Sequence, residues 1–193
     1  MSGLLRVGSS GPQVAQLKER LRSLRYAVDR GTTFTQATHH AVMAFQKVNG
    51  LARDGVAGAN TLAKLQRPQG VRLGRGEASR VVVDLSDQVL MVVRGGRVAK
   101  IVNACTGNPD LSDGRGEATP VGTFRVGRRI AGPHQAELGV LYSPSFFNRG
   151  IAVHGAPLVL ATRASHGCVR IPMHLAQPIQ DAMRAGSLVQ VRP

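Results

Sequence analysis

The first third of the chain carries apolar residues at helical spacing. Directly after the helix-start signal of Ser10 and Pro12, they recur three or four positions apart as Val14, Leu17, Leu21 and Leu24. A second helix is expected after Thr35, with an apolar side and a stop at Asn49-Gly50. That side holds Ala37, Ala41, Ala44, Phe45 and Val48. A short third helix is expected over 60–65. Residues 1–66 are therefore predicted to form a three-helix bundle.

Residues 67–78 break this pattern. They contain Pro68 and three glycines and show no apolar periodicity. We expect a linker here, joining domains at 1–66 and 79–193.

From Ser79 onward, the pattern is typical of β-structure. Short apolar segments alternate with turns such as Gly95-Gly96, and one helix is expected near 175–184, around Pro178. The expected strands are 80–85, 88–93, 97–105, 123–126, 151–153 and 188–191. The fold class is thus α+β: an N-terminal three-helix bundle followed by a mostly β domain with an antiparallel sheet or barrel.

Composition and charge restrict the partners. The chain has 193 residues, 42% of them apolar, and lacks a run of about 18 apolar residues, so no transmembrane segment is expected. Its net charge of +14 divides into +7 over 1–67, +1 over 68–78 and +6 over 79–193, with no concentrated run. Such a surface attracts any polyanion, including an anionic wall polymer. With seven aromatic residues and no Trp, specific nucleic-acid binding is not expected.

The two cysteines, Cys105 and Cys168, are too few for a disulfide scaffold and lack the spacing of a zinc site. Cys105 ends an apolar strand and is interpreted as a packing residue. Cys168 follows Gly167 and has histidines at 166 and 154. A thiol needs a base to form a thiolate, and the base needs a partner that holds its ring.

Spacing leaves two candidates for the base. His166 shares a face with Cys168 if the segment is extended. His154 is favoured, because a ring carried by a separate strand aligns on the sulfur more freely.

Other polar clusters are interpreted as structural. His39-His40 is expected on a solvated helix face, because adjacent helical residues diverge and no third metal ligand is evident. The 110–114 loop does not match a calcium-binding pattern and is read as a surface loop. His134 and His174 show no partner and are read as surface or structural residues. Neither a metal nor a cofactor is expected.

Residues 80–191 resemble the L,D-transpeptidase catalytic domain of the YkuD family. The resemblance rests on His154-Gly155 at a strand end, a loop, and then Ser165-His166-Gly167-Cys168; residues 118–124 and 142–150 are also similar to the family. It implies that Cys168 is the nucleophile and His154 the general base, held by the Gly155 carbonyl. The Gly167 and Cys168 amides would form the oxyanion hole, with His166 lining the site.

The substrate-binding residues implied are Ser165, Arg170 and Tyr142. The signature often has Asn where this chain has Arg170, whose guanidinium suits a stem-peptide carboxylate. Tyr142, Phe146 and Phe147 either wall the donor groove or serve as core aromatics. The loop between His154 and Ser165 holds only ten residues and looks short for the family.

Residues 1–66 resemble the type-1 peptidoglycan-binding domain. The resemblance is carried by Gly8 to Leu21 in the first helix, residues 41–46 in the second, and 50–62 after it. It implies that the bundle holds the protein on the cell wall and raises the local substrate concentration.

The resemblances together imply an acyl transfer on peptidoglycan stem peptides. Cys168 attacks the third-residue carbonyl of a donor tetrapeptide, D-Ala leaves, and an amine on a neighbouring stem closes a 3→3 cross-link. Alternatives left open are an L,D-carboxypeptidase, D-amino-acid exchange, a stem-cleaving cysteine endopeptidase, a non-catalytic wall-binding protein and a polyanion binder.

The implied location is the cell wall, on the periplasmic or extracellular face. The N-terminal stretch shows no apolar segment of signal-peptide length, so the export route stays open.

Overall fold

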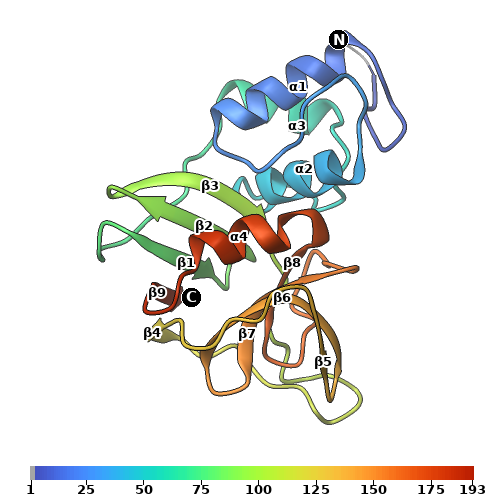
Figure 1. The fold of residues 1–193 in the computed structure, drawn as a ribbon. Coiled ribbons are helices and arrows are strands. Elements are labelled where there is room, and N and C mark those ends of the chain that lie inside the picture. Colours follow the sequence, from blue (N-terminus) through green and yellow to red (C-terminus); the bar gives the residue numbers. More distant parts are fainter. Residues whose placement is uncertain (1–2) are drawn as a thin grey trace.

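The computed structural model describes residues 3–193 and begins with a helical unit. This unit contains helices α1 (Pro12–Ser23), α2 (Gln36–Val48) and α3 (Ala59–Gln66), which lie together at the top of Figure 1. The helix positions agree with those predicted, but the start of α1 differs. Its N-cap is Gly11, at φ 121°, and not Ser10, so no side chain caps this helix. Thr35 caps α2 as expected, in a reciprocal arrangement with Thr38.

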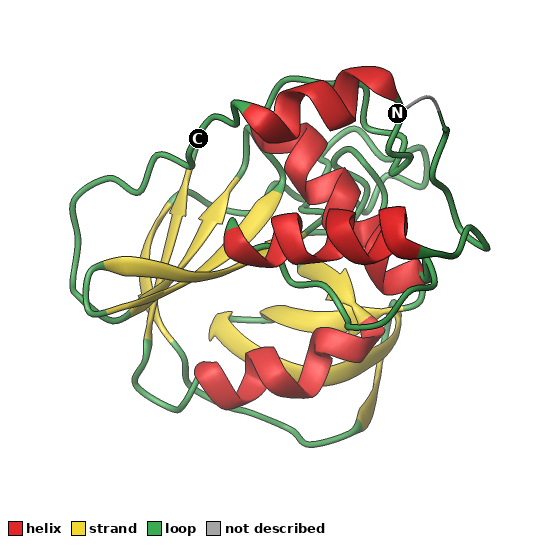
Figure 2. Ribbon diagram, turned by 90° about the horizontal axis from the view of Figure 1, so that it is seen from above, coloured by secondary structure: helices red, strands yellow, loops and turns green. Residues whose placement is uncertain are grey.

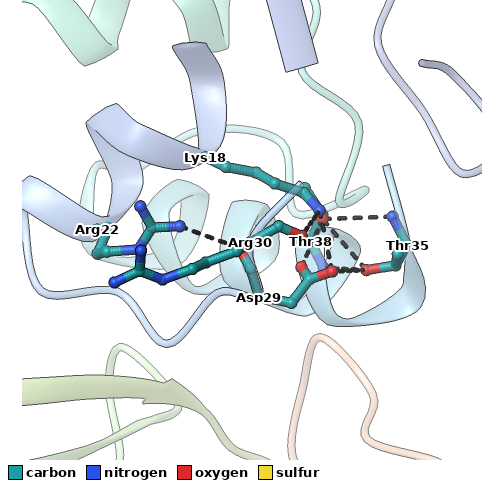
Figure 3. A network of polar contacts seen from close by, with 6 residues as sticks. All are labelled: Lys18, Arg22, Asp29, Arg30, Thr35 and Thr38. Carbon is teal, nitrogen blue, oxygen red and sulfur yellow. Dashed lines mark hydrogen bonds and ion pairs between the residues drawn. The ribbon is translucent and has the colours of Figure 1, made fainter. Parts of the chain in front are cut away.

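Asp29 organises the loop between α1 and α2. Its carboxylate accepts hydrogen bonds from Lys18 Nζ at 2.9 Å and from the hydroxyl groups of Thr35 and Thr38, both at 3.0 Å (Figure 3). Lys18 is 1% exposed, so the ion pair satisfies an ammonium group that water barely reaches. These contacts fix the start of α2 against α1.

The chain then builds a five-stranded sheet in the order β3-β2-β1-β9-β4. Neighbouring strands are antiparallel except for β1 and β9, which are parallel. The strands are β1 (Arg80–Asp84), β2 (Val89–Arg94), β3 (Arg97–Asn103), β4 (Gly122–Arg125) and β9 (Leu188–Arg192). All five were predicted, with ends that differ by a residue or two.

A second sheet of four strands has the order β5-β6-β7-β8, and its β7–β8 pair is parallel. Its strands are β5 (Pro133–Ala136), β6 (Gly139–Asn148), β7 (Ile151–Ala156) and β8 (Val169–Pro172). Only β7 was predicted as a strand. The short 3₁₀ helix η1 (Met173–Leu175) leads into α4 (Ala176–Ala182), which packs on β6 and β7 and carries Pro178 in its first turn. The α+β class is confirmed, and the β domain is mostly antiparallel as expected, divided into two sheets that each contain one parallel pair.

Strands β1 and β2 bury both of their faces. Val81 and Val83 point into a core that the two sheets share with Ile179 of α4, whereas Val82 and Met91 point the other way, into the core of the helical unit. This explains the uninterrupted apolar runs in these strands, because a sheet covered on both sides has no polar face. Figure 2 shows the helices lying over the sheets from this direction. The helical unit and the first sheet therefore share one hydrophobic core.

Backbone pairing also joins the two parts. The Ala27 amide donates to the Ile101 carbonyl at 2.9 Å, and the Ile101 amide donates to the Arg25 carbonyl at 2.8 Å, so the segment after α1 extends the edge at β3. The predicted linker, 67–78, has neither helix nor strand. It is nevertheless held in place, because Val71 and Leu73 pack against the shared core and the Gln69 amide donates to Asn49 Oδ1 at 2.7 Å.

We predict that Met91→Ala lowers the free energy of unfolding by about 2–5 kcal/mol, because it opens a cavity where the sheet meets the helical unit. Urea unfolding followed by circular dichroism should show one transition for helices and strands together. Arg94→Ala, at an exposed position of the same strand, is the matched control and should change the free energy by less than about 0.5 kcal/mol. Separate transitions for the helical and β signals would contradict the shared core.

Candidate active site

The register of the parallel β7–β8 pair brings together the candidate site residues His154, Cys168 and Arg170. Val153 lies opposite Val169, and His154 lies opposite Arg170. Cys168 immediately precedes β8 and Arg170 follows it by two residues, so their side chains leave the same face of the sheet as His154. All three line one cleft.

The thiol of Cys168 is held against the beginning of β7. The Ala152 amide donates to Sγ at 3.4 Å, and Sγ lies 3.8 Å from the Gly150 carbonyl. Burial raises the pKa of Cys168 above its ordinary value, and the nearby Glu117 carboxylate acts in the same direction. The resting group is therefore a neutral thiol near pH 7.

His154 is 3% exposed, and its Nδ1 lies 2.9 Å from the Gly155 carbonyl oxygen. Because a carbonyl only accepts, Nδ1 carries the hydrogen and Nε2 is left with a lone pair. Burial lowers the pKa of His154 to about 4. The imidazole is therefore neutral near pH 7 and able to take up a proton.

The Ser165–Cys168 segment is a turn held by its own side chains. The Ser165 hydroxyl, 1% exposed, donates to the Cys168 carbonyl and accepts from the Gly167 amide at 3.3 Å. Gly167 has φ 124°, which favours glycine because a side chain is strained there. Ser165 borders the cleft, yet its hydroxyl is used within the turn.

Two residues from the segment between β3 and β4 support this turn and were missed in the sequence. The Thr119 hydroxyl donates to the Gly167 carbonyl at 2.7 Å and accepts from the Gly107 amide at 2.9 Å. A Cβ atom on Gly107 would lie 2.7 Å from Gly167 Cα, so only glycine allows the two backbones this close. The similarity of 118–124 to the family was the one available signal.

His166 extends away from the turn toward Asp113. Its Nε2 lies 2.7 Å from Asp113 Oδ2, and this hydrogen bond lowers the pKa of Asp113 below its ordinary range. The sequence offered no sign of this pairing, because the residues are 53 positions apart and 110–114 reads as a plain surface loop.

The cleft above these groups has a volume of about 940 Å³. Its wall is partly apolar, with Phe146 and Leu158, and partly charged, with Arg128, Glu117 and Glu137. The Arg128 guanidinium stacks 4.3 Å from the Phe146 ring centroid. A wall of this composition suits a peptide that carries both charged groups and apolar stretches.

Of the other residues proposed from the sequence, some line the cleft and others lie in the core. Arg170 reaches the cleft and donates to the Ala164 carbonyl at 3.4 Å. Tyr142 pairs with Gly155 across β6 and β7, but within residues 3–193 it is Phe146, not Tyr142, that lines the cleft. Phe147 belongs to the core between the sheets, and His134 borders the cleft beside Phe146.

Cys105 is fully buried and unpaired, as expected for a packing residue, and its backbone pairs with that of Arg170. The prediction of a solvated His39-His40 face was wrong. Both rings are half-buried, with His39 against Gly55 and His40 Nδ1 at 3.1 Å from Asn103 Nδ2. His40 thus faces the sheet and His39 faces the loop after α2, which the helical pattern alone does not reveal.

Residues 3–193 contain neither a metal-binding cluster nor a membrane-spanning helix. The described part of the chain places no group of three or more His, Cys, Asp or Glu side chains where they could hold a metal ion. None of its helices has the length and apolar character needed to cross a membrane.

The fold and site define a class of protein in which a helical unit packs on a two-sheet domain, and a thiol and a neutral imidazole share the cleft of that domain. The family model described as the L,D-transpeptidase catalytic domain (YkuD) matches residues 78–191, and the one described as a putative peptidoglycan binding domain matches residues 10–65. The chain belongs to the L,D-transpeptidase family.

Solved structures agree with this assignment. An L,D-transpeptidase from Xylanimonas cellulosilytica is 36% identical, covers 100% of this chain and 98% of its own, and superposes with a TM-score of 0.87. One from Stackebrandtia nassauensis is 25% identical over 97% of this chain and 94% of its own, with a TM-score of 0.58. One from Mycobacterium tuberculosis is 21% identical over 61% of this chain and 59% of its own, with a TM-score of 0.52. At this identity the likeness concerns the fold alone. No curated protein matches the chain.

We predict that iodoacetamide alkylates Cys168 and leaves Cys105 unmodified in the native protein, because Cys105 is fully buried. The raised pKa of Cys168 means that the rate should reach half its maximum at a pH above that of an unperturbed thiol. Mass spectrometry of the peptides across a pH series provides the measurement, with glutathione as the reference thiol. A midpoint below that of glutathione would show instead a thiolate stabilised at rest.

Proposed function

We propose that this protein is a peptidoglycan L,D-transpeptidase in which Cys168 is the nucleophile and His154 the general base. The observation that carries the proposal is the placement of the two side chains on one face of the β7–β8 pair, within one cleft. The Gly155 carbonyl performs the orienting role that a carboxylate has in other triads, because it fixes Nδ1 as the donor and leaves Nε2 free.

The first half-reaction forms a thioester. His154 Nε2 takes the thiol proton while Sγ bonds to the third-residue carbonyl carbon of a donor tetrapeptide. The Cys168 amide stabilises the resulting oxyanion, and the Gly167 amide joins it only by giving up its hydrogen bond to the Ser165 hydroxyl. The carbon–nitrogen bond to D-Ala then breaks, and the proton on His154 passes to the departing amine. Because both groups are neutral at rest, proton transfer accompanies the attack.

The second half-reaction resolves the thioester. The side-chain amine of a third residue on a neighbouring stem attacks the acyl carbon, loses a proton to His154, and expels Sγ, which recovers the proton. A 3→3 cross-link results. Water in place of the amine gives an L,D-carboxypeptidase, and a free D-amino acid gives exchange.

Arg170 is suited to hold a stem-peptide carboxylate. It lies in the cleft on the same face as Cys168, and its side-chain hydrogen bond to the Ala164 carbonyl uses a single guanidinium nitrogen. A guanidinium group with further N–H donors recognises a carboxylate in bidentate fashion. Ser165 acts beside it by shaping the turn, and His166 lines the cleft while it is paired with Asp113.

The N-terminal unit, residues 1–66, would hold the enzyme on peptidoglycan, with 67–78 as a linker and 79–193 as the catalytic part. The match to a peptidoglycan-binding family supports this role. The site of action is then the cell wall, where the net charge of +14 also favours contact with anionic polymers.

We predict that the unmutated protein converts disaccharide-tetrapeptide muropeptides into a cross-linked dimer lacking one D-Ala. Cys168→Ala should abolish the product, and His154→Gln should lower its rate by about 10²–10⁴-fold through loss of the base. Cys105→Ala, which leaves the site intact, is the matched control and should keep the activity. Mass spectrometry of the products provides the measurement.

The products separate the alternatives. Tripeptide alone would indicate hydrolysis, and a product cut within the stem would indicate an endopeptidase. Unchanged tetrapeptide with every variant would overturn the enzymatic proposal and favour a wall-binding protein.

A further inference from the structure

The loop at 157–164 forms one rim of the candidate active site. It runs from the end of β7 to Ser165, and Pro157 and Leu158 line the cleft. Leu158 and Leu160 are exposed apolar side chains, whereas Val159 is buried and anchors the loop. The conformation of this short loop decides how the rim meets a substrate.

The helical unit holds this loop through a buried lysine. Lys47, near the end of α2, is 1% exposed, and its Nζ donates to the Leu160 carbonyl at 3.3 Å. Half-buried Arg53 adds a second contact, from Nη1 to the Ala161 carbonyl at 3.4 Å. Two consecutive loop carbonyls are thus bound by side chains of the helical unit.

The same ammonium group also binds the end of β3 and the turn before β2. Its Nζ lies 2.6 Å from Asn103 Oδ1, 2.8 Å from the Ala104 carbonyl and 3.1 Å from the Gln88 carbonyl. Ala104 adjoins Cys105, whose amide and carbonyl both pair with Arg170, at 3.0 and 2.9 Å. Lys47 therefore connects the rim of the cleft to the backbone beside the nucleophile.

This arrangement is unusual because all four partners are uncharged. Among the described residues, Lys47 forms no ion pair with a carboxylate, and burial lowers its pKa to about 7. Burying an amine without an opposite charge is costly, and a methionine of similar length would fill the space without that cost. What the lysine adds is the directed set of hydrogen bonds, which fixes several backbone segments relative to one another.

We propose that Lys47 is a positioning residue that sets the conformation of the 157–164 loop, so that the helical unit shapes substrate binding in the cleft in addition to holding the wall. The proposal rests on the proposed function insofar as the cleft receives stem peptides. It makes the helical unit a structural part of the active site.

The test compares Lys47→Met with Lys64→Met in the full chain; Lys64 lies on α3 of the same unit and is half-buried. Hydrogen–deuterium exchange should rise about tenfold at 157–164 in Lys47→Met, with β7 and β8 unchanged, because a local restraint is lost. The KM for the tetrapeptide donor should rise about fivefold while kcat stays within about twofold. This is the pattern expected when a variant weakens substrate binding without changing the chemical step. Lys64→Met should change neither quantity.

Arg53→Ala keeps the proposal testable if Lys47→Met does not fold. This substitution is at a half-buried position and removes the hydrogen bond to the Ala161 carbonyl. Hydrogen–deuterium exchange at 157–164 should then rise about threefold. Unchanged exchange in both variants, a rise spread evenly over both sheets, or an unchanged KM in folded and active Lys47→Met would each overturn the proposal. Hydrogen–deuterium exchange is measured without substrate. A protein that is inactive on muropeptides would therefore refute the proposed function, whereas the exchange at 157–164 would still decide whether Lys47 positions the loop.

Discussion

The functional part of this molecule depends on the register of one parallel strand pair, β7 and β8. Only with His154 opposite Arg170 do the imidazole, the guanidinium and the Cys168 thiol leave the same face. A shift by one residue would turn one set of side chains into the core, where Val153, Val169 and Ile171 now pack. The same alternation that buries these aliphatic residues therefore sets the geometry of the candidate site, and a shift of register would cost the packing of the core.

Local patterns were enough to predict the helices, the first sheet and the pair His154 and Cys168. The spacing of apolar residues predicts the helices, and uninterrupted valine-rich runs predict β1 and β2. Strands β5 and β6 were missed because they mix polar and apolar residues and are only partly covered, and β6 also has irregular register. Strand β8 was missed because it has only four residues. Long-range contacts such as Asp113–His166 and Thr119–Gly167 leave no local pattern at all. The same holds for Lys47, which in the sequence is simply a charged residue near a helix end.

The sequence suggests two domains on a tether, whereas the structure shows two parts with a common interior. Val82 and Met91 of the sheet complete the core around Phe45, and Tyr26 packs edge-on against that ring at 5.6 Å between centroids. Backbone pairing at Ile101 adds a directional contact to this apolar one. Relative motion of the two parts would have to expose this surface to water, so the helical unit and the cleft keep a fixed geometry. A protein anchored through the bundle thus presents its cleft at a defined angle to the surface that it holds.

The position of β9 has a consequence for how the protein is made. This strand is the last element of the fold, yet it lies between β1 and β4 and contributes Val189 and Val191 to the core between the sheets. The first sheet cannot close before residues 188–192 have been synthesised. The first sheet is therefore completed late, although β1, β2 and β3 all precede β9 by more than 80 residues in the chain.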